Sequence, residues 1–160
     1  MTRNQDTIDR LQEELRVAKS SLEILMNTIN YLVWVKDSND RYIQVNQSFA
    51  NFCGKTIDNM IGKTDIDIWG EGLDGKPFIE GYQSNTVEVI VIEQQETEHP
   101  KFGKQYFKII VSPILKINGT ASYVTVGIAI NITDQIDRET IAKAAIIELQ
   151  RQLSENKLVR

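Results

Sequence analysis

The sequence offers few side chains suited to catalysis. Its only histidine, His99, lies in the polar stretch ETEHPKF before a proline, and its only cysteine, Cys53, lies in NQSFANFCG. Hydrolytic and metal sites need several such groups together, and no Walker-type glycine-rich loop, G-x-S-x-G or H-E-x-x-H motif occurs. We therefore interpret His99 as an exposed loop residue and Cys53 as a small apolar side chain in a helical turn. The sequence predicts neither an enzyme nor a metal site.

Composition and charge narrow the function classes further. The chain has 160 residues, of which 41% are hydrophobic, enough for one domain with a packed core. It carries 18 Lys and Arg against 22 Asp and Glu, a formal net charge of -4, so we expect no nucleic-acid partner. A polar N-terminus and no apolar run approaching about 18 residues predict neither export nor a membrane span. A single cysteine cannot form an internal disulfide, which fits a cytoplasmic protein.

Residues 3–29 contain no Gly or Pro and carry apolar side chains at alternating spacings of three and four. These side chains are Ile8, Leu11, Leu15, Ala18, Leu22, Leu25 and Ile29. Such a seam is typical of a coiled coil and is narrower than a helix packed in a globular domain usually needs. We expect residues 1–30 to form a coiled-coil helix with a dimer seam from Ile8 to Leu25. The alternative is an amphipathic helix folded onto its own domain.

The charges beside this seam favour a parallel pair of helices. In the assigned register Glu14 occupies a g position and Lys19 the following e position. These two side chains approach each other between chains only when both helices run in the same direction. The sequence therefore predicts a parallel homodimer.

The texture changes over residues 31–133, which we assign to an α+β domain with an antiparallel sheet. The runs YLVWVKD and RYIQVN flank the turn DSND and predict a hairpin. Short helical turns follow, with Asn46 as a candidate N-cap and Gly54 and Gly62 as candidate C-caps. Pro77 suits the first turn of a longer helix, and VEVIVIEQ fits either the end of that helix or a strand. KQYFKIIVSPIL and ASYVTVGIAINI flank the Asn-Gly of KINGT, which predicts a second hairpin.

Residues 134–160 again lack Gly and Pro and predict a C-terminal helix. Heptad spacing relates Ala142, Ile146, Leu149 and Leu153, with Asn156 next in register. The strand texture of GIAINI runs into this helix without a flexible joint. Thr133 and Asp134 are candidates to accept hydrogen bonds from the first N–H groups of the helix. Such a junction can pass strain from sheet to helix, whereas a Gly-rich linker could not. The helix reaches Arg160 without a capping signal, so we expect a longer parent protein.

Three stretches resemble the PAS sensor domain family. WVKDSNDRYIQVN, over residues 34–46, is similar to the opening hairpin of that family, and GKTDID, over residues 62–67, is similar to its GKTD-x-D segment. NITD, over residues 131–134, resembles its closing D-I-T-E signature, with Asn and Asp substituted. The resemblance covers about residues 30–135. It implies a five-stranded antiparallel sheet with short helices on one face, flanked by N- and C-terminal helices.

The same resemblance implies a function in signal transduction. PAS domains typically sit between helical linkers in histidine kinases, cyclic-dinucleotide enzymes and transcription regulators. Their last strand feeds a signalling helix, which makes Thr133 and Asp134 the expected signal junction. The sequence thus predicts a cytoplasmic sensory and dimerisation module that passes a signal to an effector beyond the C-terminus. The alternatives are a small-molecule sensor with a true ligand pocket and a ligand-free protein-interaction module.

Two cofactors of the family fit poorly. The light-sensing branch binds flavin through a reactive cysteine in a GRNCRFLQ segment, and the similar stretch GKTDIDIW places Asp65 at that position. That branch also carries a glutamine in its last strand, where this chain has Ala129. Haem-binding relatives use a histidine between the positions of Pro77 and about Val91, and none is present there. The identity of any cofactor stays open.

The resemblance also suggests an interior ligand pocket. Strand periodicity puts Trp34 with Lys36 on one face, Phe107 with Ile109 and Val111 on another, and Gly127 with Ala129 on a third. By resemblance these faces look toward the helices, and Asp65 begins the helical turn that covers Lys36. Two buried charges are costly unless paired, so we predict a Lys36–Asp65 salt bridge. The candidate pocket therefore comprises Trp34, Lys36, Asp65, Phe107, Ile109, Val111 and Ala129. The alternative is a plain core that Trp34 and Phe107 fill.

Overall fold

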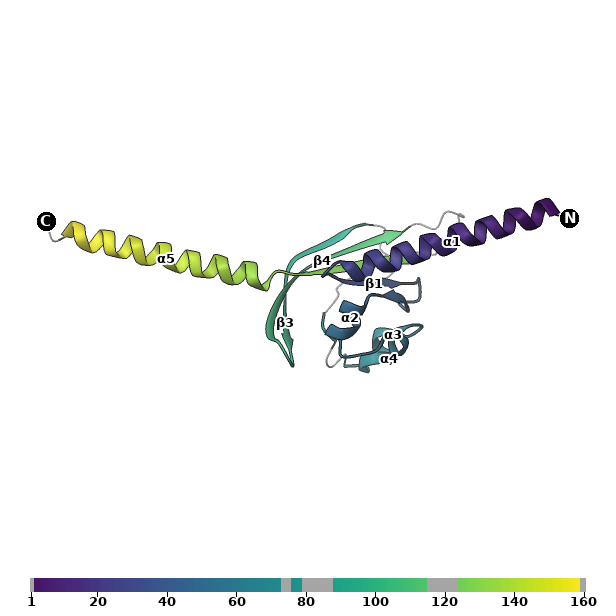
Figure 1. Cartoon of the computed structure of the whole chain (residues 1–160). Coiled ribbons are helices and arrows are strands. Elements are labelled where there is room, and N and C mark those ends of the chain that lie inside the picture. The colour runs from purple at the N-terminus through teal and green to yellow at the C-terminus, as the bar shows by residue number, and fades with distance from the viewer. Residues whose placement is uncertain (1, 73–75, 79–87, 115–123, 159–160) are drawn as a thin grey trace.

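The computed structural model of the chain describes residues 2–72, 76–78, 88–114 and 124–158. In this part of the chain, two long helices flank a sheet with short helices beside it (Figure 1). The elements are α1 (Thr2–Thr28), β1 (Leu32–Lys36), β2 (Tyr42–Val45), α2 (Gln47–Phe52), α3 (Ile57–Met60), α4 (Asp65–Trp69), β3 (Ile90–His99), β4 (Gly103–Ile114), β5 (Val124–Asn131) and α5 (Thr133–Leu158).

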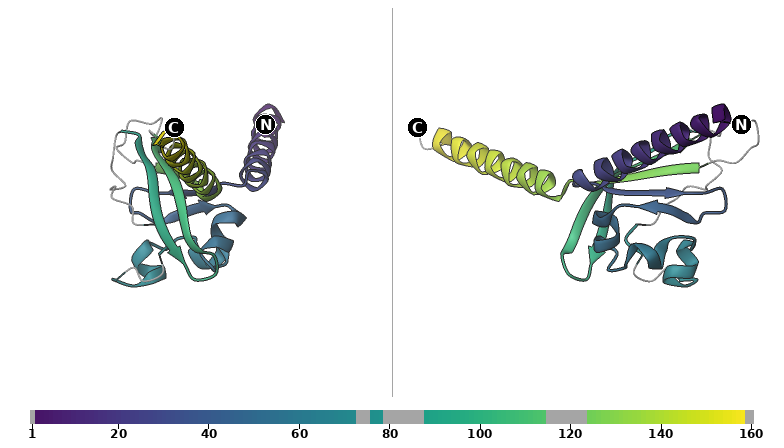
Figure 2. Two further views of the ribbon diagram at one scale, coloured as in Figure 1. Left: turned by 90° about the vertical axis from the view of Figure 1, so that its left-hand side faces the viewer. Right: turned by 45° about the vertical axis from the view of Figure 1, so that its right-hand side comes forward.

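The sheet has five strands in the order β2-β1-β5-β4-β3, and every neighbouring pair is antiparallel. The short helices α2, α3 and α4 lie together on one face of it (Figure 1, Figure 2). The predicted α+β class and five-stranded antiparallel sheet are therefore confirmed. The Asn-Gly turn of KINGT lies outside the described residues, but the strands expected on either side of it, β4 and β5, pair as a hairpin would require.

Local capping explains where the short helices begin and end. The side chain of Asn46 accepts a hydrogen bond from the Phe49 N–H at the start of α2, as predicted. Thr64 caps α4 in the same way and forms a reciprocal capping box with Asp67. Gly54, directly after the C-cap residue of α2, has a φ of 64°, a conformation that favours glycine. These local signals define the start of α2 and α4 and the end of α2.

A long helix is predicted to begin near Pro77, but the structure shows no helix at that position. Pro77 and Phe78 are not helical, and residues 79–87 lie outside the described residues. The ambiguous run VEVIVIEQ is resolved, because β3 begins at Ile90 and pairs along β4. Its cross-strand hydrogen bonds decide a choice that local periodicity left open.

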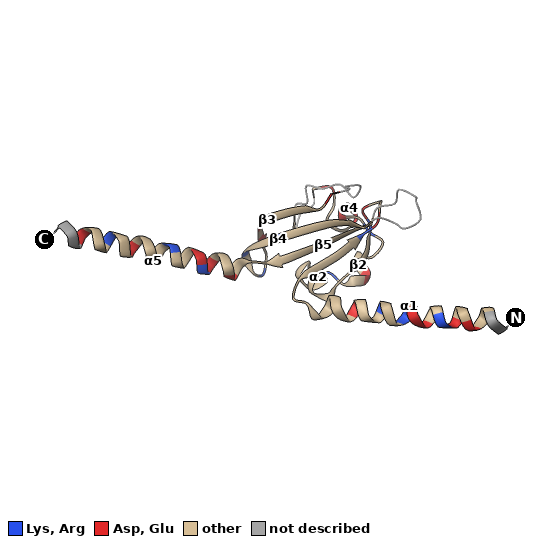
Figure 3. Cartoon of the chain, turned by 90° about the horizontal axis from the view of Figure 1, so that it is seen from above, with Lys and Arg blue, Asp and Glu red and all other residues tan. Residues whose placement is uncertain are grey.

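The long helices contribute little to the core. Of the described α1 side chains, only Met26 is buried, and the predicted seam residues are exposed. α1 therefore does not pack against its own domain along its whole length, as the alternative of an amphipathic helix would require. α5 begins at Thr133, one residue before the predicted boundary, and extends away from the sheet at the end opposite α1 (Figure 1). Charged residues of both signs follow both helices, while the central strands are mostly uncharged (Figure 3).

Candidate functional site

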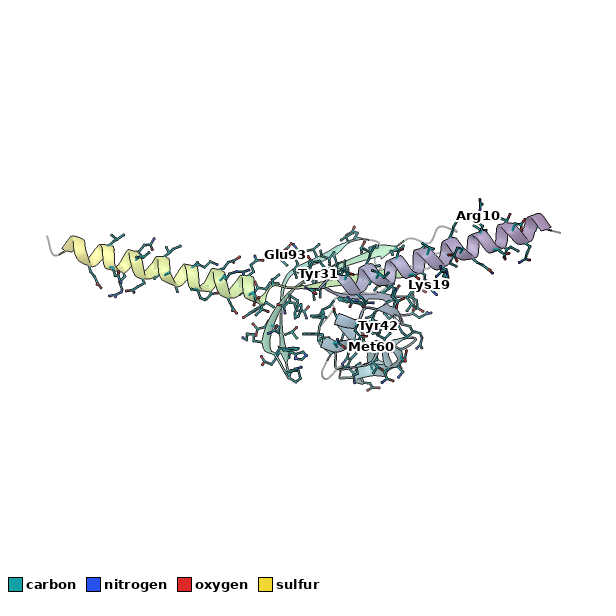
Figure 4. The ribbon with its side chains drawn as sticks, in the orientation of Figure 1. Arg10, Lys19, Tyr31, Tyr42, Met60 and Glu93 are labelled. Carbon is teal, nitrogen blue, oxygen red and sulfur yellow. The ribbon has the colours of Figure 1, made fainter. Side chains whose placement is uncertain are left out.

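The inner face of the sheet carries the predicted pocket residues. Six of them come from β1, β4 and β5 and are fully or almost fully buried: Trp34, Lys36, Phe107, Ile109, Val111 and Ala129. The predicted period-two alternation, which placed these side chains on the inner face, is thus confirmed. Tyr42 from β2 and Met60 from α3 complete the same interior, in the layer between sheet and short helices (Figure 4).

Aromatic side chains fill the centre of this interior. The Trp34 indole lies so close to Gly127 that a Cβ on Gly127 would overlap its ring. The same indole stacks on Phe49 with a centroid distance of 5.0 Å, and Phe78 meets Phe107 edge-on at 4.9 Å. These contacts support the packed-core alternative at the position where an interior ligand would lie.

A buried polar cluster lies at one end of this core, around Asp65 at the first turn of α4. Lys36 Nζ is 2.8 Å from Asp65 Oδ2, which confirms the predicted salt bridge. Lys76 Nζ lies 2.6 Å from the same oxygen, and the Tyr42 hydroxyl donates to Asp65 Oδ1 at 2.7 Å. The Lys36 ammonium also lies 4.7 Å from the centroid of the Tyr42 ring. One carboxylate therefore joins the sheet, α4 and the segment before Pro77.

The charge balance of this cluster favours an ionised carboxylate. Burial opposes ionisation of Asp65, but the nearby charges of Lys36 and Lys76 and their hydrogen bonds outweigh it. The pKa of the Asp65 carboxyl is consequently lower than its ordinary value.

Sequence reasoning missed three residues of this cluster. Lys76 lies 11 residues after Asp65, and no local sequence pattern links the two. Tyr42 lies opposite Lys36 only because β1 and β2 pair with a bulge. Thr125 faces Lys36 from β5, and its buried hydroxyl has no hydrogen-bond partner among the described residues. Thr125 precedes Gly127 by two residues, so the alternation of side chains along the strand would have placed it on this face.

The start of α5 is fastened to β4. Ile132 N–H donates to the Tyr106 carbonyl at 2.8 Å, and Tyr106 N–H donates to the Thr133 hydroxyl at 2.9 Å. The side chain of Asn131 accepts a hydrogen bond from Thr133 N–H at 2.9 Å. The residues at the start of α5 are therefore held to β4 by two hydrogen bonds to the backbone of Tyr106.

This geometry corrects the expected capping roles. Thr133 or Asp134 was expected to accept hydrogen bonds from N–H groups further along the helix. Instead, the Thr133 hydroxyl bonds to the sheet, and Asn131 satisfies the N–H of the first helical residue. Asp134 is exposed in the first turn, where its negative charge suits the helix dipole. The N-cap rule considers only neighbouring residues, so it could not include Tyr106, which lies 27 residues away in sequence.

Solved structures with this architecture identify the fold. The PAS domain of BvgS from Bordetella pertussis matches with a TM-score of 0.64 at 16% sequence identity. The match covers 83% of this chain and 98% of that chain. The chain has the PAS fold.

Two larger proteins share the PAS fold over part of their length. A phage VqmA in complex with DPO matches with a TM-score of 0.55 at 18% identity, over 87% of this chain and 62% of that chain. An RNA-binding light-oxygen-voltage receptor matches with a TM-score of 0.56 at 12% identity, over 86% of this chain and 39% of that chain. At these identities the likeness shows the fold alone. No family model matches the chain, and no curated protein matches it.

The only histidine in the sequence, His99, does not lie in an exposed loop as predicted. His99 is the last residue of β3 and is half-buried, not an exposed loop residue. Its Nδ1 accepts hydrogen bonds from Lys101 N–H and Phe102 N–H, so its Nε2 carries the proton and donates to the Phe52 carbonyl at 2.9 Å. The ring also lies 4.5 Å from that of Phe52. The sequence could not show this, because Phe52 is 47 residues away.

Within the described residues, no group of three or more His, Cys, Asp or Glu side chains is arranged to hold a metal ion. None of the described helices is long and apolar enough to span a membrane.

Proposed function

We propose that this chain is a cytoplasmic, non-enzymatic PAS sensory and dimerisation module that passes a change in its domain through α5 to an effector beyond the C-terminus. The parent protein on this proposal is a sensor kinase or a cyclic-dinucleotide signalling protein, and its partner is a second copy of the chain.

The attachment of α5 to β4 carries this proposal. Two hydrogen bonds from one residue, Tyr106, hold Ile132 and Thr133, and β5 runs into α5 with one residue between the two elements. A rigid strand-to-helix connection of this kind lets two arrangements of the sheet favour two positions of the helix.

The exposed face of α1 supports the dimer. The large seam residues Ile8, Leu11, Leu15, Leu22 and Leu25 are between 46% and 66% exposed. A groove between α1 and the domain is lined, on the helix side, by Arg16, Lys19, Ser20, Glu23, Met26 and Asn27. In the heptad register these are b, e and f positions, so none is a seam residue. The domain and a partner helix can therefore occupy different faces of α1, with Lys19, at an e position, on the border between them.

Light scattering of the intact chain tests the dimer. We expect twice the mass of one chain for the wild type, and one chain for a Leu15→Glu plus Leu22→Glu variant. The matched control is Val17→Glu plus Ile24→Glu, because these side chains are also exposed, at 50% and 66%, but occupy c positions. An unchanged mass in the seam variant contradicts the proposal, and loss of the dimer in the control alone contradicts the register.

A small-molecule sensor with an interior pocket is a second candidate function. One observation favours it: the buried Thr125 hydroxyl beside Lys36 has no hydrogen-bond partner among the described residues. A polar ligand group could satisfy this hydroxyl. Screening by thermal shift tests this, because a ligand that binds the native state raises the melting temperature. For an interior ligand the rise should shrink in Thr125→Val, which keeps the side-chain volume and removes the hydroxyl.

A further inference from the structure

A second concave site lies outside the core, at the end of the sheet where β3 turns into β4. It is a cleft of about 810 Å³ between α2 and this turn. Its lining includes Phe52, Lys55, His99, Lys101 and Phe102. The volume is in the range of small-molecule sites, and the proposed interior pocket shares none of these residues.

Aromatic rings form the wall of this cleft. The Phe52 ring is nearly parallel to those of Phe78 and Phe102, with interplanar angles of 9° and 10°. The His99 ring lies beside both Phe52 and Phe102, at centroid distances of 4.5 Å and 4.6 Å, while the centroids of those two rings are 6.4 Å apart. The stack begins in the core at Phe78 and ends at Phe102, which is 52% exposed. Another planar ring could extend this stack at its exposed end.

The charges around the exposed ring favour an anion. Lys101 Nζ lies 5.2 Å from the centroid of the Phe102 ring, and Lys55 lines the same cleft, against one lining carboxylate, that of Glu98. A ring that stacked on Phe102 would compete with this cation for the aromatic face. A carboxylate on the incoming ring would give the lysine a new partner, whereas a neutral ring would not.

We propose that this cleft binds a small aromatic carboxylate, with its ring against Phe102 and its carboxylate near Lys101. Phe52 and His99 hold the Phe102 ring in place from within the domain.

A chain of hydrogen bonds connects this cleft to α5. The Gln105 side chain donates to the Phe102 carbonyl at 3.0 Å and accepts a hydrogen bond from the Asn131 side chain at 2.9 Å. Asn131 in turn accepts a hydrogen bond from Thr133 N–H. Gln105 is thus a positioning residue between the ligand site and the helix start. This step rests on the proposed function, whereas binding in the cleft does not.

Titration with phenylacetate, followed by backbone amide NMR, tests the binding. We expect saturable shifts of the amides of Glu98, His99, Lys101 and Phe102, with a Kd of about 1 mM or lower, reasonable for a ligand of this size. Phe102→Leu and Lys101→Gln should each weaken binding about threefold to tenfold. Phenylacetamide, which lacks the charge, should also bind more weakly. The matched controls are Ile114→Ala and Lys143→Gln, exposed side chains distant in sequence from the cleft that should leave the Kd unchanged.

Shifts that do not saturate by about 10 mM overturn the site, as do equal affinities in Phe102→Leu and wild type. Hydrogen exchange at residues 133–140 tests the connection separately. Phenylacetate should change protection there in the wild type, and Gln105→Ala should bind phenylacetate but lose this change. No change in the wild type overturns the connection and leaves the binding result standing. Binding by the monomeric Leu15→Glu plus Leu22→Glu variant separates this site from the dimer.

Discussion

The Trp34 indole lies directly against the backbone of Gly127, across the β1–β5 pair. Any side chain at residue 127 must displace this ring or move β5. Because Trp34 also stacks on Phe49 and Phe78, the ring has little room to move. We expect Gly127→Ala to lower the free energy of unfolding by about 1–3 kcal/mol through overpacking. Chemical denaturation measures this loss.

A double variant provides the control for this prediction. In a Trp34→Phe background, where the ring is smaller, Gly127→Ala should cost less than it does in the wild type. Equal costs in both backgrounds would mean that the two residues do not compete for this space.

Removal of the Asp65 carboxylate should destabilise the domain strongly. Asp65→Ala leaves the ammonium groups of Lys36 and Lys76 without the carboxylate that joins them, in a site where both side chains are at most 7% exposed. The expected loss is about 3–5 kcal/mol in denaturant titration. Glu96→Ala, which breaks the exposed pair with Lys104, is the matched control and should cost much less. A loss below about 1 kcal/mol for Asp65→Ala would place the pair on the scale of surface salt bridges.

Acid should weaken the domain through the same residue. The Asp65 pKa in the folded chain lies below its ordinary value of 3.8, because Lys36 and Lys76 outweigh the effect of burial. The stabilisation is therefore complete only above about pH 5 and is lost as the pH falls through 3.8 toward the folded-state pKa. We expect unfolding free energies measured from pH 6 to pH 2.5 to fall less steeply below about pH 4 in Asp65→Asn than in the wild type. Parallel curves would contradict this assignment.

The α5 junction should depend on Thr133 more than on Asp134. Thr133→Val removes the acceptor of the Tyr106 N–H at nearly constant volume. We expect faster hydrogen exchange at Tyr106 and over residues 134–145, with a local loss of about 1–2 kcal/mol. Asp134→Ala is the control and should have a smaller effect, because its side chain is exposed. Protection equal to wild type in Thr133→Val would make the junction an ordinary linker and remove the basis for transmission.

Asn46 should be the most sensitive position between α1 and the domain. Its Oδ1 accepts from Val33 N–H and Phe49 N–H, and its Nδ2 donates to the carbonyls of Met26 and Tyr31. Asn46→Asp would place a carboxylate against those two carbonyls, and we expect a loss of about 2–4 kcal/mol. Faster exchange at residues 24–28 should accompany the loss. Gln47→Glu, the exposed neighbour, is the control.

Periodicity was sufficient for the inner face of β4 and β5, because buried residues alternate with partly buried ones along the middle of both strands. The alternation around Trp34 and Phe107 therefore reported the inner face correctly. The Lys36–Asp65 pair was also predictable, since a charge on a buried face needs a partner. The expectation that Asp65 lies near Lys36 came from the family resemblance and not from the residues alone.

The remaining features depend on contacts that local sequence does not encode. Lys76 joins Asp65 across a glycine-rich stretch, and Phe52 orients His99 from another element. Thr133 fits the sequence pattern of a helix cap, but its hydroxyl accepts a hydrogen bond from the Tyr106 N–H of β4. In each case a tertiary partner competed successfully with the local preference.

The two long helices leave the domain at opposite ends, and the chain runs in the same general direction through both (Figure 1). Each residue of an α-helix turns the following side chains by about 100°. The length of α5 therefore sets the rotational phase in which any fused domain is presented relative to the α1 seam. Inserting one residue after Leu153 would rotate such a domain by about a quarter of a turn, whereas inserting seven would nearly restore its orientation about 10 Å further along the axis.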